Sequence, residues 1–415
     1  MKNIPRFIPS LTIKDMGTAF FAPRKGGECR DPLIDFAKQF AEYIGVSYAI
    51  PAPSARGALK GILHALALPG GGEVILPSLV FHCIPSIFLE FGLKLRFVDI
   101  DPKTQCIDID RIESAVTSTT VAIFPVHLYG RACNMEKIKA IADRYGLVII
   151  EDCAQSCGTY YSGKRVGSFG QAAIFSFSPH KNLSVLGMGM AVTGSYDLAV
   201  KIGSWLEQKP RIGNVALTKK IFYSAGMRLV TRPWFWDPIM TTILKLFDSR
   251  GIDLIEVLTN ESSHTHTVAQ RISSCMPKSL YGKIGMLQLK KLDALNRMRI
   301  HNGNKLYEYL QGLFGIELPA PARFGENIFS TFVIRVNNRP RFRNRLRRLG
   351  VDTHGGDMSV GPCLLGAKSL TEAENAFDAA KRIVHLPIYP QMRESDLLRV
   401  AQAIKIVLRD QVKQG

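Results

Sequence analysis

The chain contains 415 residues, of which 46% are hydrophobic and 21% are charged. These proportions are typical of soluble globular proteins with two or three domains, and they exclude a small disulfide scaffold or a disordered chain. Lys and Arg number 53 against 35 Asp and Glu, giving a formal net charge of +18. Such a balance favours anionic partners, such as phosphorylated metabolites, nucleic acid or an acidic membrane surface, without choosing among them.

The eight cysteines are scattered and form no C-x-x-C pair. This spacing predicts reduced thiols in a cytoplasmic protein and no metal site. The first residues lack the apolar run of a signal peptide, and no stretch of 18 uncharged apolar residues occurs. Secretion and membrane spanning are therefore not expected.

Between residues 46 and 195, short runs rich in Val and Ile alternate with helical patterns. The alternation is typical of βαβ units, and apolar runs without strict alternation indicate strands buried on both faces of a parallel sheet. Helices are expected at 54–68, 84–92 and 134–146, and strands at 73–76, 93–100, 120–126, 147–152, 172–177 and 189–194. The pattern predicts an α/β domain with a mostly parallel central sheet.

The pattern changes after residue 205, where aromatic and basic residues predict an atypical helical insert over about 205–270. A long helix from about 285, a strand at 330–336 and helices at 341–350 and 395–408 then indicate a small α+β unit. We therefore expect a large domain over 1–270 and a small C-terminal domain over 271–415. The insert has three interpretations: membrane contact through 222–247, packing on a partner subunit, or cover for a substrate cleft. Packing is favoured.

Lys181 follows a predicted buried strand and lies in a loop rich in Ser, Gly and Asn. An amine in a partly desolvated pocket loses proton affinity and becomes a usable nucleophile for a carbonyl or an aldehyde cofactor. A loop lysine that points to water is the simpler interpretation of this segment alone.

Asp152 ends a predicted strand about thirty residues earlier, where ligands bind in parallel sheets. An aspartate there can hold a protonated pyridine nitrogen, although an N-cap for a following helix is an alternative. The small residues of PSARGAL, before a predicted helix, suit a phosphate at the helix N-terminus.

Several longer motifs, in order, resemble the DegT/DnrJ/EryC1/StrS family of sugar aminotransferases, which use pyridoxal 5′-phosphate (PLP). The resemblance covers about 30–205 and 275–410, and its motifs are FVDIDPKTQCID, PVHLYGRACNMEKI, IIEDCAQSCGTYYSGKRVGSFGQAAIFSFSPHKNL, LQLKKLD and HLPIYPQM. It implies the fold-type I PLP-dependent transferase architecture and a homodimer with residues of both subunits in each site.

The resemblance also implies residue roles. Lys181 matches the lysine that holds PLP through a Schiff base and shuttles the proton. The cofactor-binding positions are Asp152 at the pyridine nitrogen, Gln155 beside the ring hydroxyl, Phe81 stacked on the ring, and Ser176, Ala55 and Arg56 at the phosphate. His127 and Tyr129, in PVHLYG, are candidates for orienting the cofactor or substrate. A buried histidine with its hydrogen bonds satisfied is an equal alternative for His127.

Three positions depart from the family pattern. Arg56 replaces a small hydroxyl residue, GMGM at 187–190 replaces GDGG or GEGG, and SSCM at 273–276 replaces a segment that reaches the neighbouring subunit. Arg56 either contacts the phosphate through its guanidinium or points away from it, and GMGM changes the floor of the pocket. SSCM predicts weaker or differently built phosphate binding across the dimer.

The function implied by the resemblance is transfer of an amino group from L-glutamate to a keto-sugar on a nucleotide or similar anionic carrier, in polysaccharide or amino-sugar biosynthesis. A sugar dehydratase or deoxygenase is an alternative that Lys181 disfavours, because related dehydratases carry a histidine there. A non-catalytic, membrane-associated interaction protein is a second alternative. The arginine-rich run 341–350 has interleaved Phe and Leu, which indicates one buried face rather than a nucleic-acid site.

Overall fold

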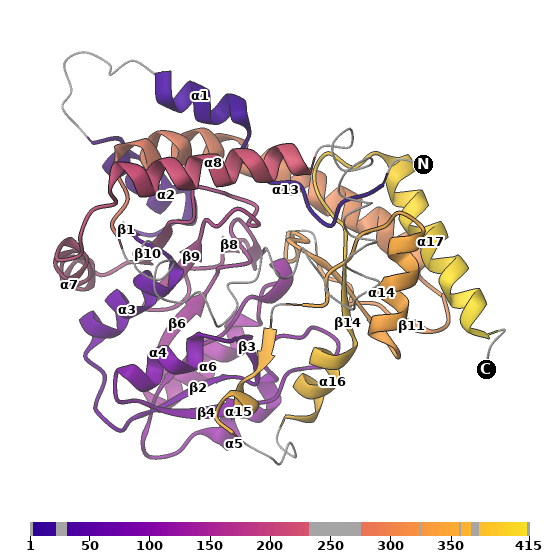
Figure 1. The fold of residues 1–415 in the computed structure, drawn as a ribbon. Coiled ribbons are helices and arrows are strands. Elements are labelled where there is room, and N and C mark those ends of the chain that lie inside the picture. Colours follow the sequence, from indigo (N-terminus) through magenta and orange to yellow (C-terminus); the bar gives the residue numbers. More distant parts are fainter. Residues whose placement is uncertain are drawn as a thin grey trace.

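The structure is a computed structural model that describes residues 3–21, 31–231, 275–323, 325–356, 358–366 and 373–412. Figure 1 shows a large α/β part, mostly in indigo and magenta, beside a smaller part in orange and yellow. The predicted fold class, α/β with a mostly parallel central sheet, is confirmed.

The central sheet has seven strands in the order β1-β10-β9-β6-β5-β2-β4. Only β10 runs antiparallel to its neighbours. Each of the six predicted strands is present, and β1 forms the edge beside β10. The bounds are β1 Tyr48–Ala52, β2 Glu73–Pro77, β4 Lys94–Val98, β5 Thr120–Ile123, β6 Val148–Asp152, β9 Ala172–Ser176 and β10 Gly189–Thr193.

Helices cover both faces of this sheet, which explains why its strands read as continuous apolar runs. In β9, Ala172 and Ile174 face one hydrophobic core, while Ala173 and Phe175 face the other. The first face is covered by α3 (Ala55–Leu66), α4 (Ile84–Glu90) and α7 (Tyr196–Glu207), and the second by α1 (Ile13–Phe21), α2 (Pro32–Ile44) and α6 (Met135–Tyr145). Short elements fill the connections: β3 Leu79–Phe81, η1 Ile109–Arg111, α5 Ile112–Ala115, η2 Leu128–Gly130, β7 Tyr160–Tyr161 and β8 Lys164–Arg165.

A single long helix, α13 (Ser279–Leu310), joins the large and small regions and begins six residues before the predicted position. Its first half packs against α2, whereas Leu306 and Leu310 belong to the core of the small region. The small region has a three-stranded antiparallel sheet in the order β11-β12-β14. Its elements are β11 Ile316–Glu317, β12 Phe332–Val336, α14 Arg339–Arg348, β14 Ile383–Leu386 and α17 Glu394–Val412.

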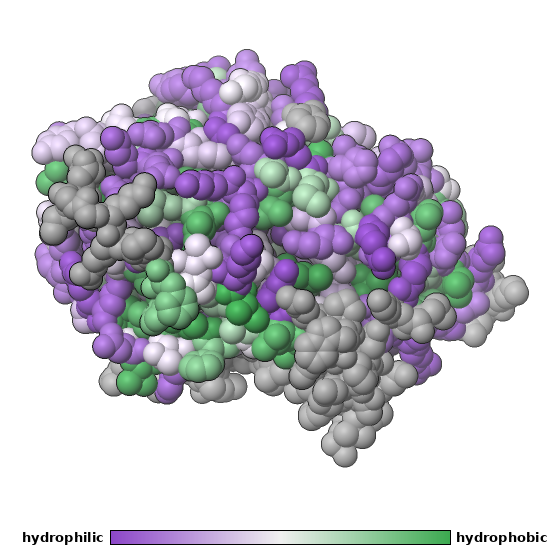
Figure 2. All heavy atoms as spheres, turned by 90° about the horizontal axis from the view of Figure 1, so that it is seen from above, coloured by the Kyte–Doolittle hydropathy of each residue, from purple (hydrophilic) through white to green (hydrophobic). Residues whose placement is uncertain are grey.

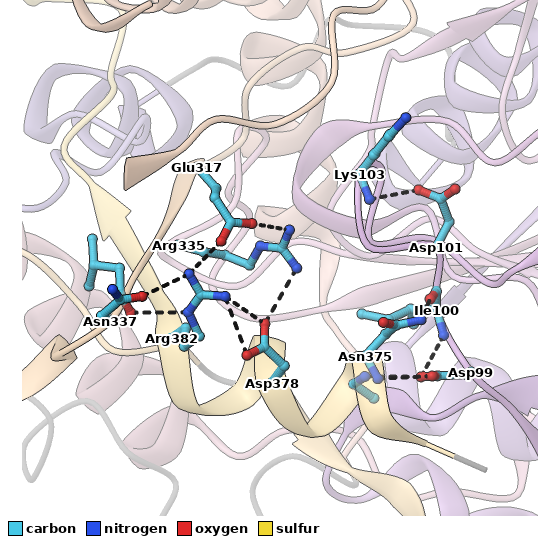
Figure 3. Close-up of polar contacts among 12 residues, drawn as sticks. Asp99, Ile100, Asp101, Lys103, Glu317, Arg335, Asn337, Asn375, Asp378 and Arg382 are labelled. Atoms are coloured by element: carbon cyan, nitrogen blue, oxygen red, sulfur yellow. Dashed lines mark hydrogen bonds and ion pairs between the residues drawn. The ribbon is translucent and has the colours of Figure 1, made fainter. Parts of the chain in front are cut away.

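The C-terminal segment also returns to the large region. β13 (Met358–Val360) pairs with β3, α15 (Gly361–Leu364) follows, and α16 (Glu374–Arg382) packs on the first core. Figure 3 shows the start of α16 held by Asp99, whose buried carboxylate accepts hydrogen bonds from the backbone of Asn375 and Ala376. At the other end of the helix, Arg382 and Asp378 form ion pairs with β11 and β12 (Figure 3). A domain boundary at 270 remains a prediction.

The predicted insert contributes one described helix, α8 (Asn214–Val230), while residues 232–274 lie outside the described residues. Leu217 and Ile221 pack on the second core, whereas the Phe222 side chain is 71% exposed. In Figure 1, α8 lies near the top of the molecule, and its residues Asn214 and Lys220 contact the start of α13. Figure 2 looks down on this side, where apolar side chains lie among polar ones. None of the described helices meets the length and hydropathy that a membrane crossing needs.

Candidate active site

The candidate residues gather where parallel strands end at one edge of the central sheet. β1, β6 and β9 point the same way, so their carboxyl ends open on a common edge. Asp152 is the last residue of β6, Ser176 is the last of β9, and α3 begins with Ala55 just beyond β1. The fold therefore brings a carboxylate, a hydroxyl and a helix N-terminus to one side of the sheet.

Asp152 is a buried carboxylate within electrostatic reach of Lys181. Its Oδ1 accepts a hydrogen bond of 2.9 Å from the Ala154 backbone N–H. Burial raises the pKa of Asp152, while the Ala154 hydrogen bond and the charge of Lys181 act in the opposite direction. A buried carboxylate of this kind suits a cationic partner, such as a protonated ring nitrogen.

Lys181 lies half-buried in the loop that follows β9. Its backbone N–H donates to the Ser178 carbonyl at 3.0 Å, and the Ser10 hydroxyl donates to the Lys181 carbonyl at 3.4 Å. The neighbouring His180 points elsewhere, because its ring packs edge-on against Phe7 at 4.5 Å. Lys181, rather than His180, is therefore the basic residue of this loop that acts on the Asp152 carboxylate.

Gly189 lies between Ser176 and the first turn of α3. In the sheet register Gly189 pairs with Ser176, and a Cβ at Gly189 would lie 2.2 Å from the Ser54 carbonyl carbon. Ser54 caps the helix by accepting from the Gly57 N–H at 3.2 Å. A helix N-terminus with a hydroxyl beside it is a favourable site for a phosphate.

Together these groups fit PLP. A helix N-terminus with a serine suits its phosphate, a buried carboxylate suits its ring nitrogen, and a lysine amine suits its aldehyde. Arg56, the departure from the family pattern, lies half-buried in the same first turn of α3.

Gln155 joins two loops at this edge. Its Oε1 accepts a hydrogen bond of 3.0 Å from the backbone N–H of Tyr129, which has a left-handed φ of 58°. The Tyr129 ring is buried and packs edge-on against His385 at 5.2 Å. Contact of Tyr129 with a substrate remains a prediction.

His127 is fully buried, and protein groups use both of its ring nitrogens. Nδ1 accepts from the Cys133 N–H at 3.0 Å, so Nε2 carries the proton and donates to Glu151 at 3.0 Å. Glu151 also accepts backbone N–H groups from Gly167, Phe169 and Gly170, each at 2.8 Å. His127, Glu151 and Cys153 place possible ligand atoms within 4.8 Å of one another, but these hydrogen bonds already occupy the imidazole and the carboxylate. The geometry favours the alternative of a satisfied core histidine.

Phe81 ends β3, whose partner strand β13 comes from the C-terminal segment. Its ring is half-buried and lies 4.3 Å from the His82 ring. Stacking of Phe81 on a cofactor ring remains a prediction.

The other two departures have different structural consequences. In GMGM, Met188 and Met190 are buried in the second core, and Gly187 has a left-handed φ of 81°. In SSCM, Ser273 and Ser274 lie outside the described residues, while Met276 exchanges backbone hydrogen bonds with 210–212.

Two buried polar residues near the site had not been expected from the sequence. Asn182, directly after Lys181, and Asn296 of α13 hydrogen bond to each other at 3.0 Å. The position of Asn182 beside Lys181 was an available signal. Nothing in the sequence pointed to Asn296, because it is 114 residues from Asn182 and no local pattern indicates their contact.

Comparison with known proteins identifies the family. The model of the DegT/DnrJ/EryC1/StrS aminotransferase family matches residues 31–210 and 237–405. The residues passed over, 211–236, include α8, so this helix belongs to the segment that departs from the family pattern.

Similar curated proteins include a UDP-N-acetyl-3-dehydro-α-D-glucosamine 3-aminotransferase of Acidithiobacillus ferrooxidans, 30% identical over 88% of this chain and 85% of the relative. The spore coat polysaccharide biosynthesis protein SpsC of Bacillus subtilis is 27% identical over 98% of this chain and 97% of its own length. Among solved structures, Streptomyces venezuelae DesV in complex with a ketimine intermediate has the same fold, with a TM-score of 0.73, 24% identity and coverage of 98% and 99%. The chain therefore belongs to the DegT/DnrJ/EryC1/StrS aminotransferase family, whose members depend on PLP.

Proposed function

We propose that this aminotransferase moves an amino group from L-glutamate to a keto-sugar carried by a nucleotide or a similar anionic group, in polysaccharide or amino-sugar biosynthesis. The central support is the common sheet edge that gathers Lys181, Asp152, Ser176 and the first turn of α3. Relatives named for UDP- and dTDP-linked amino sugars support the substrate class. The net charge of +18 suits such anionic substrates.

Each residue has a defined task in this proposal. When bound, PLP supplies an aldehyde that condenses with amines and a ring that withdraws electrons from the bonds beside the amine. Lys181 would hold the cofactor through its amine and would move the proton at the reacting carbon of the substrate. Asp152 would accept a hydrogen bond from the protonated ring nitrogen and keep it cationic, because a buried carboxylate is stabilised by a cation.

The remaining residues bind and orient. Ser176 and the N–H groups of the first turn of α3, including Ala55 and Arg56, hold the phosphate. Gln155, whose Oε1 accepts a hydrogen bond from the Tyr129 N–H, would bind beside the ring hydroxyl, and Phe81 would cover the ring. Tyr129 lines the substrate side.

The same proposal includes a homodimer with shared active sites in the cytoplasm. Peripheral membrane contact through 222–247 is a separate proposal, and its described support is the exposed Phe222 beside Tyr223 on α8. Sugar dehydration and a non-catalytic role are the alternatives. Both are disfavoured, because neither uses Lys181 for proton transfer.

Transfer of labelled nitrogen tests the reaction directly. PLP-loaded protein is incubated with ¹⁵N-glutamate and UDP- or dTDP-linked keto-sugars, and the products are examined by mass spectrometry. The proposal expects ¹⁵N in the sugar and 2-oxoglutarate in equal amount. A sugar product that has lost water and gained no ¹⁵N supports the dehydratase instead, and unchanged sugars throughout contradict this acceptor class.

A further inference from the structure

The middle of α13 carries a row of four polar side chains that bind other segments of the chain. The row consists of Asp293, Asn296, Arg299 and Asn302; at a spacing of three residues each member lies next to the following one, and the row winds about half a turn around the helix. Asn296, Arg299 and Asn302 are almost completely buried. Buried polar groups need partners, and the members of this row bind segments that are distant from α13 in the sequence.

Asn296 binds the loops that carry Lys181 and follow Asp152. The Asn182 Nδ2 donates to the Cys157 carbonyl at 2.6 Å and to the Asn296 Oδ1 at 3.0 Å. The Asn296 Nδ2 in turn donates to the same carbonyl at 3.1 Å. The two side-chain amides and the Cys157 carbonyl form a closed triangle of hydrogen bonds. Asn182 is the residue after Lys181, so the triangle fixes the backbone next to Lys181.

Close packing prevents this triangle from shifting. Gly158, next to Cys157, has a φ of +90°, and a Cβ there would lie 2.6 Å from both the Asn296 Nδ2 and the Tyr43 hydroxyl. The Tyr43 hydroxyl donates to Asp293 at 2.5 Å, and Arg165 donates to the other oxygen of Asp293 at 3.2 Å. Asp293, which precedes Asn296 by about one helical turn, therefore fixes α13 to the large region.

The other end of the row binds the C-terminal segment. Arg299 donates to the Ile388 carbonyl at 3.2 Å, and Asn302 donates to the Tyr389 carbonyl at 3.0 Å. Burial lowers the pKa of Arg299 to about 10, which fits a guanidinium held by a carbonyl in an apolar setting. Asn296 and Asn302 are six residues apart on α13, which corresponds to about 9 Å along the helix axis. The helix therefore fixes the distance between its contacts with the Lys181 loop and with the 388–389 segment.

We propose that Asn296 is a positioning residue: through Asn182 it fixes the position of the Lys181 amine relative to Asp152. The helix α13 links this position to the small region. The inference rests on the proposed function, since it assigns Lys181 as the reacting amine. Asn296 acts through Asn182 and does not touch the reacting atoms.

Reactivity of Lys181 in the cofactor-free protein tests the inference. Competitive acetylation across pH, read by mass spectrometry, reports the environment of this one amine in wild type, Asn296→Ala, the near-isosteric Asn296→Asp, and the control Asn304→Ala. Asn304 is exposed on the same helix. We expect a shifted midpoint in both Asn296 variants, larger in Asn296→Ala, and none in Asn304→Ala.

The loaded protein gives a second readout. The Asn296 variants should lower kcat about 10- to 100-fold, as expected for a displacement near 1 Å, with a smaller change in the KM for glutamate. Asn296→Asp keeps the acceptor for Asn182 and loses the donor to Cys157, so it should fall between wild type and Asn296→Ala. Asn296 variants that fold normally and match wild type in Lys181 reactivity overturn the inference. If Asn296→Ala does not fold, the Lys181 reactivity of Asn296→Asp is compared with that of wild type, and a match overturns the inference. A wild type that never binds PLP defeats the proposed function instead, while the acetylation result still stands.

Discussion

Gly189 lies directly against Ser54, with no room for a side chain between the start of β10 and the first turn of α3. A Cβ at this position would lie 2.2 Å from the Ser54 carbonyl carbon and 2.4 Å from the Ala55 nitrogen. Because these atoms are backbone, a larger residue must displace the turn. The approach holds the N-terminus of α3 beside Ser176.

Gly189→Ala should therefore weaken PLP binding while the central sheet stays folded. Displacing the turn removes backbone N–H groups from the phosphate, and we expect the Kd for PLP to rise about tenfold or more. Gly194→Ala, one residue beyond the other end of β10, is the matched control, because no atom lies within 4 Å of its added Cβ. Equal PLP affinity in both variants, measured by fluorescence titration, would refute the proposed phosphate site.

Asp152→Asn should stabilise the cofactor-free protein at neutral pH and reduce its activity. Burial raises the pKa of Asp152, so the ionised form is disfavoured in the folded state. This destabilisation by the ionised Asp152 is fully present above the pKa of Asp152 in the folded protein. It disappears as the pH falls below the pKa of Asp152 in the unfolded chain. The variant should thus melt higher than wild type near pH 7, with a difference that closes toward about pH 4.

Activity should move the opposite way in this variant. An amide holds the ring-nitrogen proton poorly, and loss of one such electrostatic contact costs about 10²-fold or more in kcat. Thermal unfolding across pH and steady-state kinetics check the two effects. A variant as active as wild type would remove Asp152 from the site.

Glu151→Ala should be strongly destabilising, although its neighbour Asp152 is the functional carboxylate. Four donors, from His127 and three backbone N–H groups, would lose a buried acceptor. We expect a loss of about 4 kcal/mol or more in the free energy of unfolding. The exposed Glu113, paired with Arg144 at the surface, supplies the control, and Glu113→Ala should cost less than about 1 kcal/mol. Urea unfolding compares the two, and a small effect of Glu151→Ala would show that this network contributes little.

Asp99→Ala should release the start of α16 from the large region of the molecule. The Asp99 carboxylate receives the backbone N–H groups of Asn375 and Ala376, each at 2.9 Å, and so caps a helix that is distant in sequence. Loss of a cap costs about 1–2 kcal/mol. Hydrogen exchange of these two amides should accelerate in Asp99→Ala and remain unchanged in Asp101→Ala, since the Asp101 carboxylate accepts from its own turn. Unchanged protection in Asp99→Ala would contradict the capping role.

The sequence predicted the central sheet well because its strands are buried on both faces and read as continuous apolar runs. It also predicted that Asp152 ends a strand, where ligands bind in parallel sheets, whereas Ser176 was expected inside its strand and forms its last residue. Other relationships depend on contacts between distant residues that no local pattern records. The pairing of β3 with β13 joins Phe81 to Met358, and the Asn182–Asn296 contact closes over 114 residues. The role of His127 stayed open in the sequence because only the structure shows both of its nitrogens bonded.

The most direct test of the account is the visible absorbance of the purified protein supplied with PLP, before and after L-glutamate, beside Lys181→Ala and the exposed control Lys201→Ala. The account predicts a visible band in wild type and Lys201→Ala that glutamate bleaches with release of 2-oxoglutarate, and a turnover at least about 10³-fold lower in Lys181→Ala. A Lys181→Ala protein that shows the same band and the same bleaching as wild type would contradict it.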